Sequence, residues 1–191
     1  MPKDLDKQVL STMAMEVVKD TFKKMLQVEF SAPPVAVEKN IIEYKSRMRV
    51  SPMEKFNAPA YVSYVNFYLS QKDLQAEIAV GTFILCVKDD VVEKLSKAFK
   101  LSSKDAENEN LQMDNVAEFC NILAGNVSNE LTKLGYANLF MSAPYKGMNA
   151  IPEGVPFDYA LYSKQEISFF FWNEKCIVVE LCIGRVPFRQ A

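Results

Sequence analysis

Two stretches of the chain place apolar residues at the spacing of an amphipathic helix. The first covers residues 5–28, with apolar positions at Leu5, Val9, Met13, Val17, Phe22, Met25 and Leu26. The second begins at Asp114, with apolar positions at Val116, Phe119, Leu123, Val127, Leu131 and Leu134. Because residues three and four apart share one face of a helix, both stretches predict helices that bury one side.

Alternating or continuous apolar runs predict strands in most of the remaining chain. The expected strands are residues 61–69, 75–86, 159–163, 166–172 and 177–183, with short ones at 35–37 and 41–44. The first two are expected to form a hairpin around a turn at 70–73, and the last two around a turn at 173–175. Prolines interrupt residues 31–60, so this stretch is expected to be mostly irregular.

The order of these elements indicates a fold class. Asp89 and Asp90 suit the start of a further helix, residues 101–112 are expected to be a linker, and residues 145–158 a loop. Strand runs grouped between helices favour an α+β fold, an antiparallel β-sheet covered by long amphipathic helices, over a doubly wound parallel sheet. Residues 1–191 are expected to form one domain.

An internal duplication is also predicted. Sliding the sequence by 111 residues lays Ser31-Ala32-Pro33 on Ser142-Ala143-Pro144, and it lays one predicted helix on the other. This suggests two helix–strand halves, residues 1–34 and 114–144, related by a pseudo-twofold axis. The alternative is a chance match between two amphipathic helices that precede the same tripeptide.

Composition and charge exclude several classes of function. The chain has 191 residues, 49% of them hydrophobic, and a formal net charge of −2. A near-neutral chain without a basic patch argues against binding to nucleic acid through its phosphates. No apolar run approaches the length of a membrane span, and the N-terminus lacks a signal-peptide core. We therefore expect a soluble cytoplasmic protein with no membrane partner.

The residues available for catalysis are also limited. The sequence contains no histidine, which removes Ser-His and Cys-His nucleophile arrangements and the usual zinc sites. The four cysteines, Cys86, Cys120, Cys176 and Cys182, lie in apolar contexts and form no C-x-x-C pair. They are interpreted as buried, reduced thiols. The chemistry must come from carboxylates, amides, hydroxyls or a partner.

A line of polar residues follows the second predicted helix opposite its apolar face. Asp114, Glu118 and Asn121 are spaced by four and three residues, so they stack on one side of a helix, within about 60° of arc. Gly125 continues the line, and a glycine there permits another surface to approach the backbone closely. One face is therefore expected to be buried, while the other presents a carboxylate and an amide.

This spacing resembles the signature of the CheC/CheX/FliY chemotaxis phosphatases. The family pattern is Asp or Ser, three residues, Glu, two residues, Asn, about twenty-two residues, and then Pro. Here it falls on Asp114, Glu118, Asn121 and Pro144, with Gly125 followed by another Asn. The first half of the predicted duplication lacks the polar line, so the single site resembles CheX more than CheC.

The resemblance implies a function: hydrolysis of the aspartyl phosphate of a response-regulator receiver domain such as CheY-P. The receiver supplies the divalent cation, Mg²⁺ in the usual case, so no cofactor of this chain is expected. Asn121 is assigned to positioning the attacking water, and Glu118 to docking on the receiver's lysine. Asp114 is interpreted as a helix cap in preference to an acidic docking edge, and Pro144 as a structural residue.

Other interpretations remain open. The chain could be a catalytically silent module that docks on a receiver or on a flagellar-switch component, or Glu118 and Asn121 could be ordinary solvent-facing residues. A self-standing phosphoesterase has little support, because neither a metal cluster nor a phosphate-binding glycine loop is visible. The resemblance also implies a homodimer, for which an outward aromatic pair within residues 169–172 is a candidate contact.

Overall fold

The structure, a computed structural model, describes residues 6–92 and 108–189. Its helices are α1 (Lys7–Thr21), continued by a π-helical turn (Phe22–Leu26), α2 (Pro52–Phe56), α3 (Gln71–Gln75) and α6 (Glu109–Lys133). Its strands are β1 (Ala32–Asn40), β2 (Glu43–Tyr44), β3 (Arg47–Met48), β4 (Ala60–Tyr68), β5 (Gly81–Lys88), β6 (Phe140–Met141), β7 (Tyr145–Met148), β8 (Ser163–Phe171) and β9 (Glu174–Ile183). No helix in these ranges is both long and apolar enough to cross a membrane.

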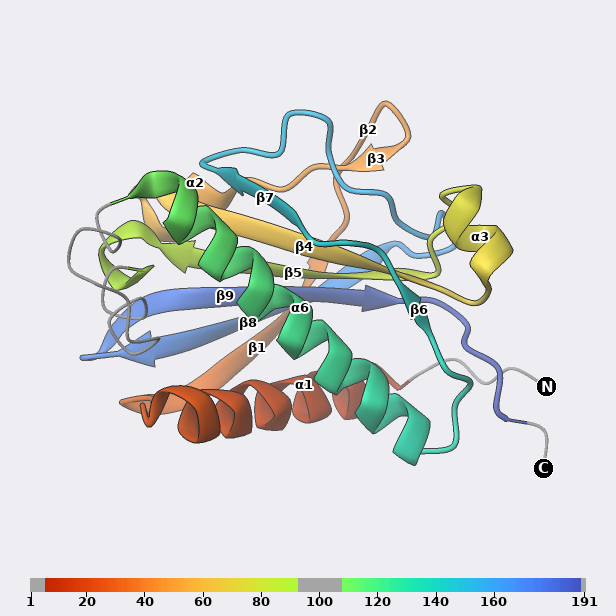
Figure 1. Ribbon diagram of the computed structural model, residues 1–191, viewed down its shortest axis with the longest axis horizontal. Coiled ribbons are helices and arrows are strands. Elements are labelled where there is room, and N and C mark those ends of the chain that lie inside the picture. The colour runs from red at the N-terminus through yellow and green to blue at the C-terminus, as the bar shows by residue number, and fades with distance from the viewer. Residues whose placement is uncertain (1–5, 93–107, 190–191) are drawn as a thin grey trace.

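One antiparallel sheet forms the centre of the molecule. Its strand order is β1-β8-β9-β5-β4-β6, and β7 also pairs with β4 at the same edge as β6. Helices α1 and α6 both lie on one face of this sheet, where they contact each other (Figure 1). The predicted α+β class, an antiparallel sheet covered by long helices, is confirmed.

Each face of the sheet has its own core, because successive side chains of a strand point to opposite faces. Towards α1 and α6, residues such as Phe83, Leu85 and Val179 join the apolar sides of the two helices. On the far face, residues such as Ile84 and Cys86 pack with Met48 of β3 and with the segment that follows β7. The central strand β4 is consequently buried along its whole length.

The prediction of a mostly irregular segment at 31–60 is wrong in part. Its first residues form the nine-residue strand β1, although Pro33 and Pro34 lie within it. Strand β1 pairs only with β8 and so lies at an edge of the sheet, with an irregular register between Ala32 and Val35. An edge strand tolerates proline because one row of its backbone N–H groups has no ladder partner.

Several predicted boundaries also need correction. The strand expected at 75–86 begins only at Gly81, because α3 and its following turn occupy the residues before it. The expected loop at 145–158 starts with strand β7, and no strand lies at 159–162. The last two strands turn at Trp172 and Asn173, which both have positive φ, so β9 starts at Glu174.

The two long helices differ from prediction at their ends. Helix α1 is capped by Asp6, whose side chain accepts hydrogen bonds from the backbone of Gln8 and Val9. Val9 and Met25 were expected to be buried, but both are exposed, and Leu10 and Ala14 fill the core instead. The expected linker at 101–112 ends earlier, because α6 begins at Glu109. The helix predicted after Asp90 lies mostly outside the described residues.

The strand order is compatible with the predicted duplication without establishing it. The hairpin β8–β9 and the antiparallel pair β4–β5 lie side by side through the β9–β5 ladder, and β1 and β7 flank them at opposite edges. Strand β7 directly follows Ser142-Ala143-Pro144, whereas β1 begins within the other segment, at Ala32. The duplication stays a prediction.

A buried charge cluster stabilises the far face of the sheet. The carboxylate of Glu180, which is 1% exposed, accepts a hydrogen bond from Lys55 Nζ at 2.5 Å and forms an ion pair with Lys164 Nζ at 2.8 Å. Lys55 also pairs with Glu166 at 2.9 Å. Burial alone would lower the pKa of Lys55, but the adjacent Glu180 carboxylate outweighs it and raises the pKa. The lysine therefore stays charged inside the protein.

We expect the substitution Glu180→Leu to destabilise the fold by about 3 kcal/mol, because it leaves Lys164 buried without its anionic partner. The double variant Glu180→Leu/Lys164→Met should recover part of this loss. Chemical denaturation would measure both. As a control, Glu16→Gln breaks an exposed helical ion pair and should cost well under ~1 kcal/mol. Equal losses for Glu180→Leu and Glu16→Gln would contradict the prediction.

Candidate functional site

The candidate site lies on helix α6, which starts at Glu109, five residues before Asp114. Asn108 is the N-cap, and its side chain accepts hydrogen bonds from the backbone N–H groups of Asn110 and Leu111. This geometry satisfies two of the free donors at the helix start. The interpretation of Asp114 as the helix cap is therefore wrong, because Asp114 lies in the second turn, where backbone donors already have partners.

The apolar side of α6 fixes how the helix is rotated. Phe119, Leu123 and Val127 are almost fully buried between the sheet and α1. The ring of Phe119 meets that of Phe22 edge-on, with 4.7 Å between the ring centroids. At the start of the helix, the hydroxyl of Tyr61 on β4 donates a hydrogen bond to Gln112. Burial raises the pKa of Tyr61 to about 12, so this hydroxyl keeps its proton.

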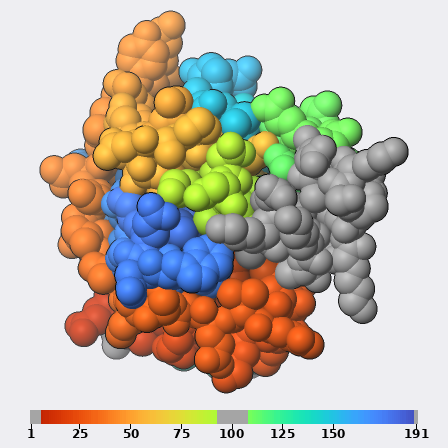
Figure 2. Space-filling view, turned by 90° about the vertical axis from the view of Figure 1, so that its left-hand side faces the viewer, coloured from red at the N-terminus to blue at the C-terminus, as the bar shows by residue number. Residues whose placement is uncertain are grey.

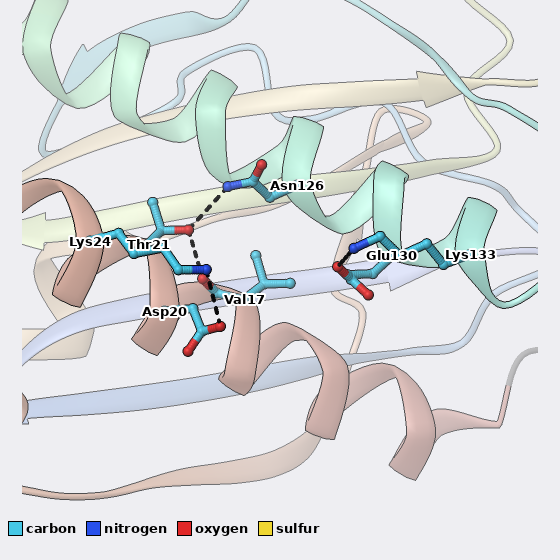
Figure 3. A network of polar contacts seen from close by, with 7 residues as sticks. All are labelled: Val17, Asp20, Thr21, Lys24, Asn126, Glu130 and Lys133. Carbon is cyan, nitrogen blue, oxygen red and sulfur yellow. Dashed lines mark hydrogen bonds and ion pairs between the residues drawn. The ribbon is translucent and has the colours of Figure 1, made fainter.

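A polar contact joins α6 to α1 beside their apolar contacts (Figure 3). The amide of Asn126 donates a hydrogen bond to the hydroxyl of Thr21 at 3.1 Å, and that hydroxyl in turn donates to the carbonyl of Val17. The Asn that follows Gly125 in the motif thus contacts the neighbouring helix. It helps to orient the polar line without belonging to it.

The remaining side of α6 presents the predicted polar line to solvent. Asp114 and Glu118 are exposed, and Asn121 is partly exposed. Within residues 6–92 and 108–189, neither Glu118 nor Asn121 has a hydrogen-bond or ion-pair partner. An acid and an amide are therefore held on one outward face, both available to another molecule.

Asp114 differs from these two because it forms an ion pair with Lys146 of strand β7. About half of each side chain is exposed. The beginning of α6 (green) and the segment around β7 (cyan) lie beside each other at the surface (Figure 2). The sequence motif does not indicate a role for Lys146, because its ion pair with Asp114 forms only when β7 pairs with β4 beside α6.

Gly125 lies one turn beyond Asn121 and leaves open space above the helix. A Cβ atom built on Gly125 would meet no other described group within 4 Å. The role of Gly125 in admitting another surface stays a prediction. The apolar side ends sooner than predicted, because Leu134, expected to be buried, is 48% exposed and lies just past the end of the helix.

Pro144 lies between the short edge strands β6 and β7, where it interrupts their pairing with β4. A proline suits this position because its ring nitrogen cannot donate to a ladder. Before it, the hydroxyl of Ser142 accepts a hydrogen bond from the backbone of Asn66. Pro144 thus separates two short strands beside α6, as expected of a structural residue.

The chemistry available at this surface is limited. No group of three or more metal-binding side chains occurs among the described residues. The four cysteines are buried and unpaired, and burial raises the pKa of Cys120, which lies beside Asn121, to about 12. Its thiol is therefore protonated and cannot act as a nucleophile. Among the described residues, this outward face offers hydrogen bonds and the unpaired carboxylate of Glu118.

Comparisons with known proteins agree with this geometry. Residues 72–150 match the family model described as chemotaxis phosphatase CheX, and this range contains Asp114, Glu118, Asn121, Gly125 and Pro144. A search of curated proteins gave no match. The resemblance to the CheC/CheX/FliY family inferred from the sequence is thereby confirmed.

Solved structures share the fold at low sequence identity. The chemotaxis protein CheX from Vibrio vulnificus has 13% identity and a TM-score of 0.59, with 91% of this chain and 98% of that chain covered. FliY from Thermotoga maritima has 13% identity and a TM-score of 0.59, with coverages of 93% and 89%. The CheX of a CheX–CheY–BeF3–Mg+2 complex from Borrelia burgdorferi has 15% identity and a TM-score of 0.56, with coverages of 94% and 99%.

Replacing Gly125 by Ala should stabilise the fold by about 0.5–1 kcal/mol, because alanine favours the helix and its methyl group enters open space. Thermal unfolding would show a higher midpoint. The matched control is Gly81→Ala, whose Cβ would lie 2.6 Å from the carbonyl oxygen of Cys182 and should destabilise the fold. A lower midpoint for Gly125→Ala would mean that the space above the helix is filled.

Proposed function

We propose that this chain, CheX-like over residues 72–150, is a phosphatase that accelerates hydrolysis of the aspartyl phosphate on a CheY-like receiver domain in bacterial chemotaxis. The observation that carries the proposal is the outward pair of Glu118 and Asn121 on a helix whose opposite side is locked into the core. The family match over the same helix supports it.

The groups that this chain must supply follow from the groups that a receiver domain already contains. It brings the phosphorylated carboxylate, a lysine and the divalent cation, so a helper needs no cofactor of its own. The relative solved as a CheX–CheY–BeF3–Mg+2 complex supports a cation that arrives with the receiver. Phosphoryl transfer depends mainly on positioning and charge stabilisation, and a water aligned with the breaking P–O bond is what remains to be supplied.

Asn121 is the residue proposed to hold that water. Its side-chain oxygen can accept a proton of the water while its nitrogen donates a hydrogen bond, and a neutral amide adds no charge beside the phosphoryl group. The side chain is partly exposed and has no partner in the described chain. It therefore breaks no internal hydrogen bond when it enters the receiver.

Glu118 is the proposed docking residue. It lies one turn before Asn121, is exposed, and has no cation of the described chain to pair with. A carboxylate near a phosphoryl group needs a positive partner, and the receiver's lysine is that partner. The pair would lose water on docking, which strengthens a charge-assisted bond, and it would fix the angle at which Asn121 enters.

Other features support the same surface. The space above Gly125 admits the receiver, and Pro144 shapes the neighbouring edge. We infer one CheX-like domain with a degenerate half at residues 1–34 and the motif half at 114–144, hence one site in each chain. A cytoplasmic homodimer is part of this proposal, because the CheX-like arrangement favours it.

The substitution Asn121→Ala should remove the acceleration of receiver dephosphorylation, with a loss of about a hundredfold or more, because the attacking water is no longer held in line. Docking should remain nearly unchanged, as measured by binding to a receiver loaded with BeF3 and Mg²⁺. Asn129→Ala, an exposed asparagine two turns later, is the control. An Asn121→Ala protein as fast as the parent would refute the role.

The substitution Glu118→Lys should weaken docking itself, by about tenfold or more in KM, because it places like charges together at the receiver's lysine. Stability should change little, since Glu118 is exposed. If the parent binds the receiver without accelerating hydrolysis, the chain is instead a silent docking module. If it does neither, the whole proposal fails.

A further inference from the structure

Two acidic residues lie on the polar line of α6, and they differ in whether they form an ion pair within the described chain. Asp114 pairs with Lys146 of β7, whereas Glu118 has no cationic partner within the described ranges. Four residues separate the two acids, so they lie about 6 Å apart along the helix axis. A receiver that docks over Glu118 would therefore also meet the Asp114–Lys146 pair.

The charge of Asp114 matters because a phosphorylated receiver presents a strongly anionic centre. A second uncompensated carboxylate would repel that centre and would compete with Glu118 for the receiver's lysine. A unit charge on Asp114 about 8 Å from a charged group of the receiver would change the binding equilibrium by about 2- to 30-fold. The size of the change depends on how much water remains between the two groups. The ion pair with Lys146 removes most of this effect.

We propose that Lys146 is a positioning residue of the docking surface, an inference that rests on the proposed function. It neutralises Asp114, so that on this line Glu118 is the acid that selects the receiver's lysine. It also ties the edge strand β7 to the start of α6, and these two elements lie beside each other (Figure 1). Lys146 acts through Asp114 and does not itself touch the phosphoryl group.

The test is a double-mutant cycle on receiver dephosphorylation. Lys146→Ala should raise KM about tenfold at low salt and leave kcat within about twofold, because Asn121 and its water are unchanged. Raising the salt concentration should shrink the effect, since exposed charges are screened. The double variant Asp114→Asn/Lys146→Ala should return KM to within about twofold of the parent, because it removes both charges of the pair.

Matched controls separate charge from fold. Lys133→Ala removes an exposed lysine that pairs with Glu130 near the other end of α6 and should leave KM unchanged. Thermal unfolding should give nearly equal midpoints for all variants, because exposed ion pairs contribute little to stability. A rescue of KM by the second substitution is a result that a purely structural role for Lys146 would not produce.

Two results would overturn the inference. An unchanged KM for Lys146→Ala would mean that the pair does not affect docking. A double variant as impaired as Lys146→Ala would mean that Lys146 contacts the receiver directly. Binding of each variant to a receiver loaded with BeF3 and Mg²⁺ provides a second readout that needs no turnover. If the unsubstituted protein binds the receiver without accelerating hydrolysis, the proposed function is refuted, but the binding assay still tests the role of Lys146. If the unsubstituted protein does not bind the receiver, both proposals are refuted.

Discussion

The rotation of α6 about its own axis is the constraint on which the candidate site depends. Burial of Phe119, Leu123 and Val127 between α1 and the sheet sets this rotation, and Tyr61 and Thr21 hold it through contacts with Gln112 and Asn126. One residue of helix turns the side chains by about 100°. A different choice of buried positions would therefore turn Asn121 into the core, where an unpaired amide is costly.

The sheet beneath the helix makes this rotation rigid. Its central strands are covered on both faces, so the helix packs on a surface that cannot easily move. On the far side, the charges of Lys55, Lys164, Glu166 and Glu180 are matched within the core rather than left at the surface. Rigidity matters because a residue that only positions a water must be accurately placed.

The sequence predicted the parts of the structure that local patterns control. Apolar spacing identified the buried side of α6, and the same spacing placed Glu118 and Asn121 outward. Local patterns failed where tertiary pairing decides. Pro33 and Pro34 looked like strand breakers, yet the edge position of β1 accommodates them. Asp114 looked like a helix cap, but Asn108 in the polar stretch before it fills that place. Lys146 acquires its role only because β7 folds beside α6.

Under the proposed function, the receiver would supply the reacting groups and the surface of α6 would supply only their positioning. The chain has no histidine, its cysteines are buried, and the acid beside Glu118 is already matched by a lysine. In the ranges that the structure describes, no cluster of metal-binding side chains lies at this surface. The proposed partner, a receiver domain, would bring its own metal and lysine. The outward carboxylate of Glu118 and amide of Asn121, held at fixed positions on α6, fit the proposed helper that contributes geometry.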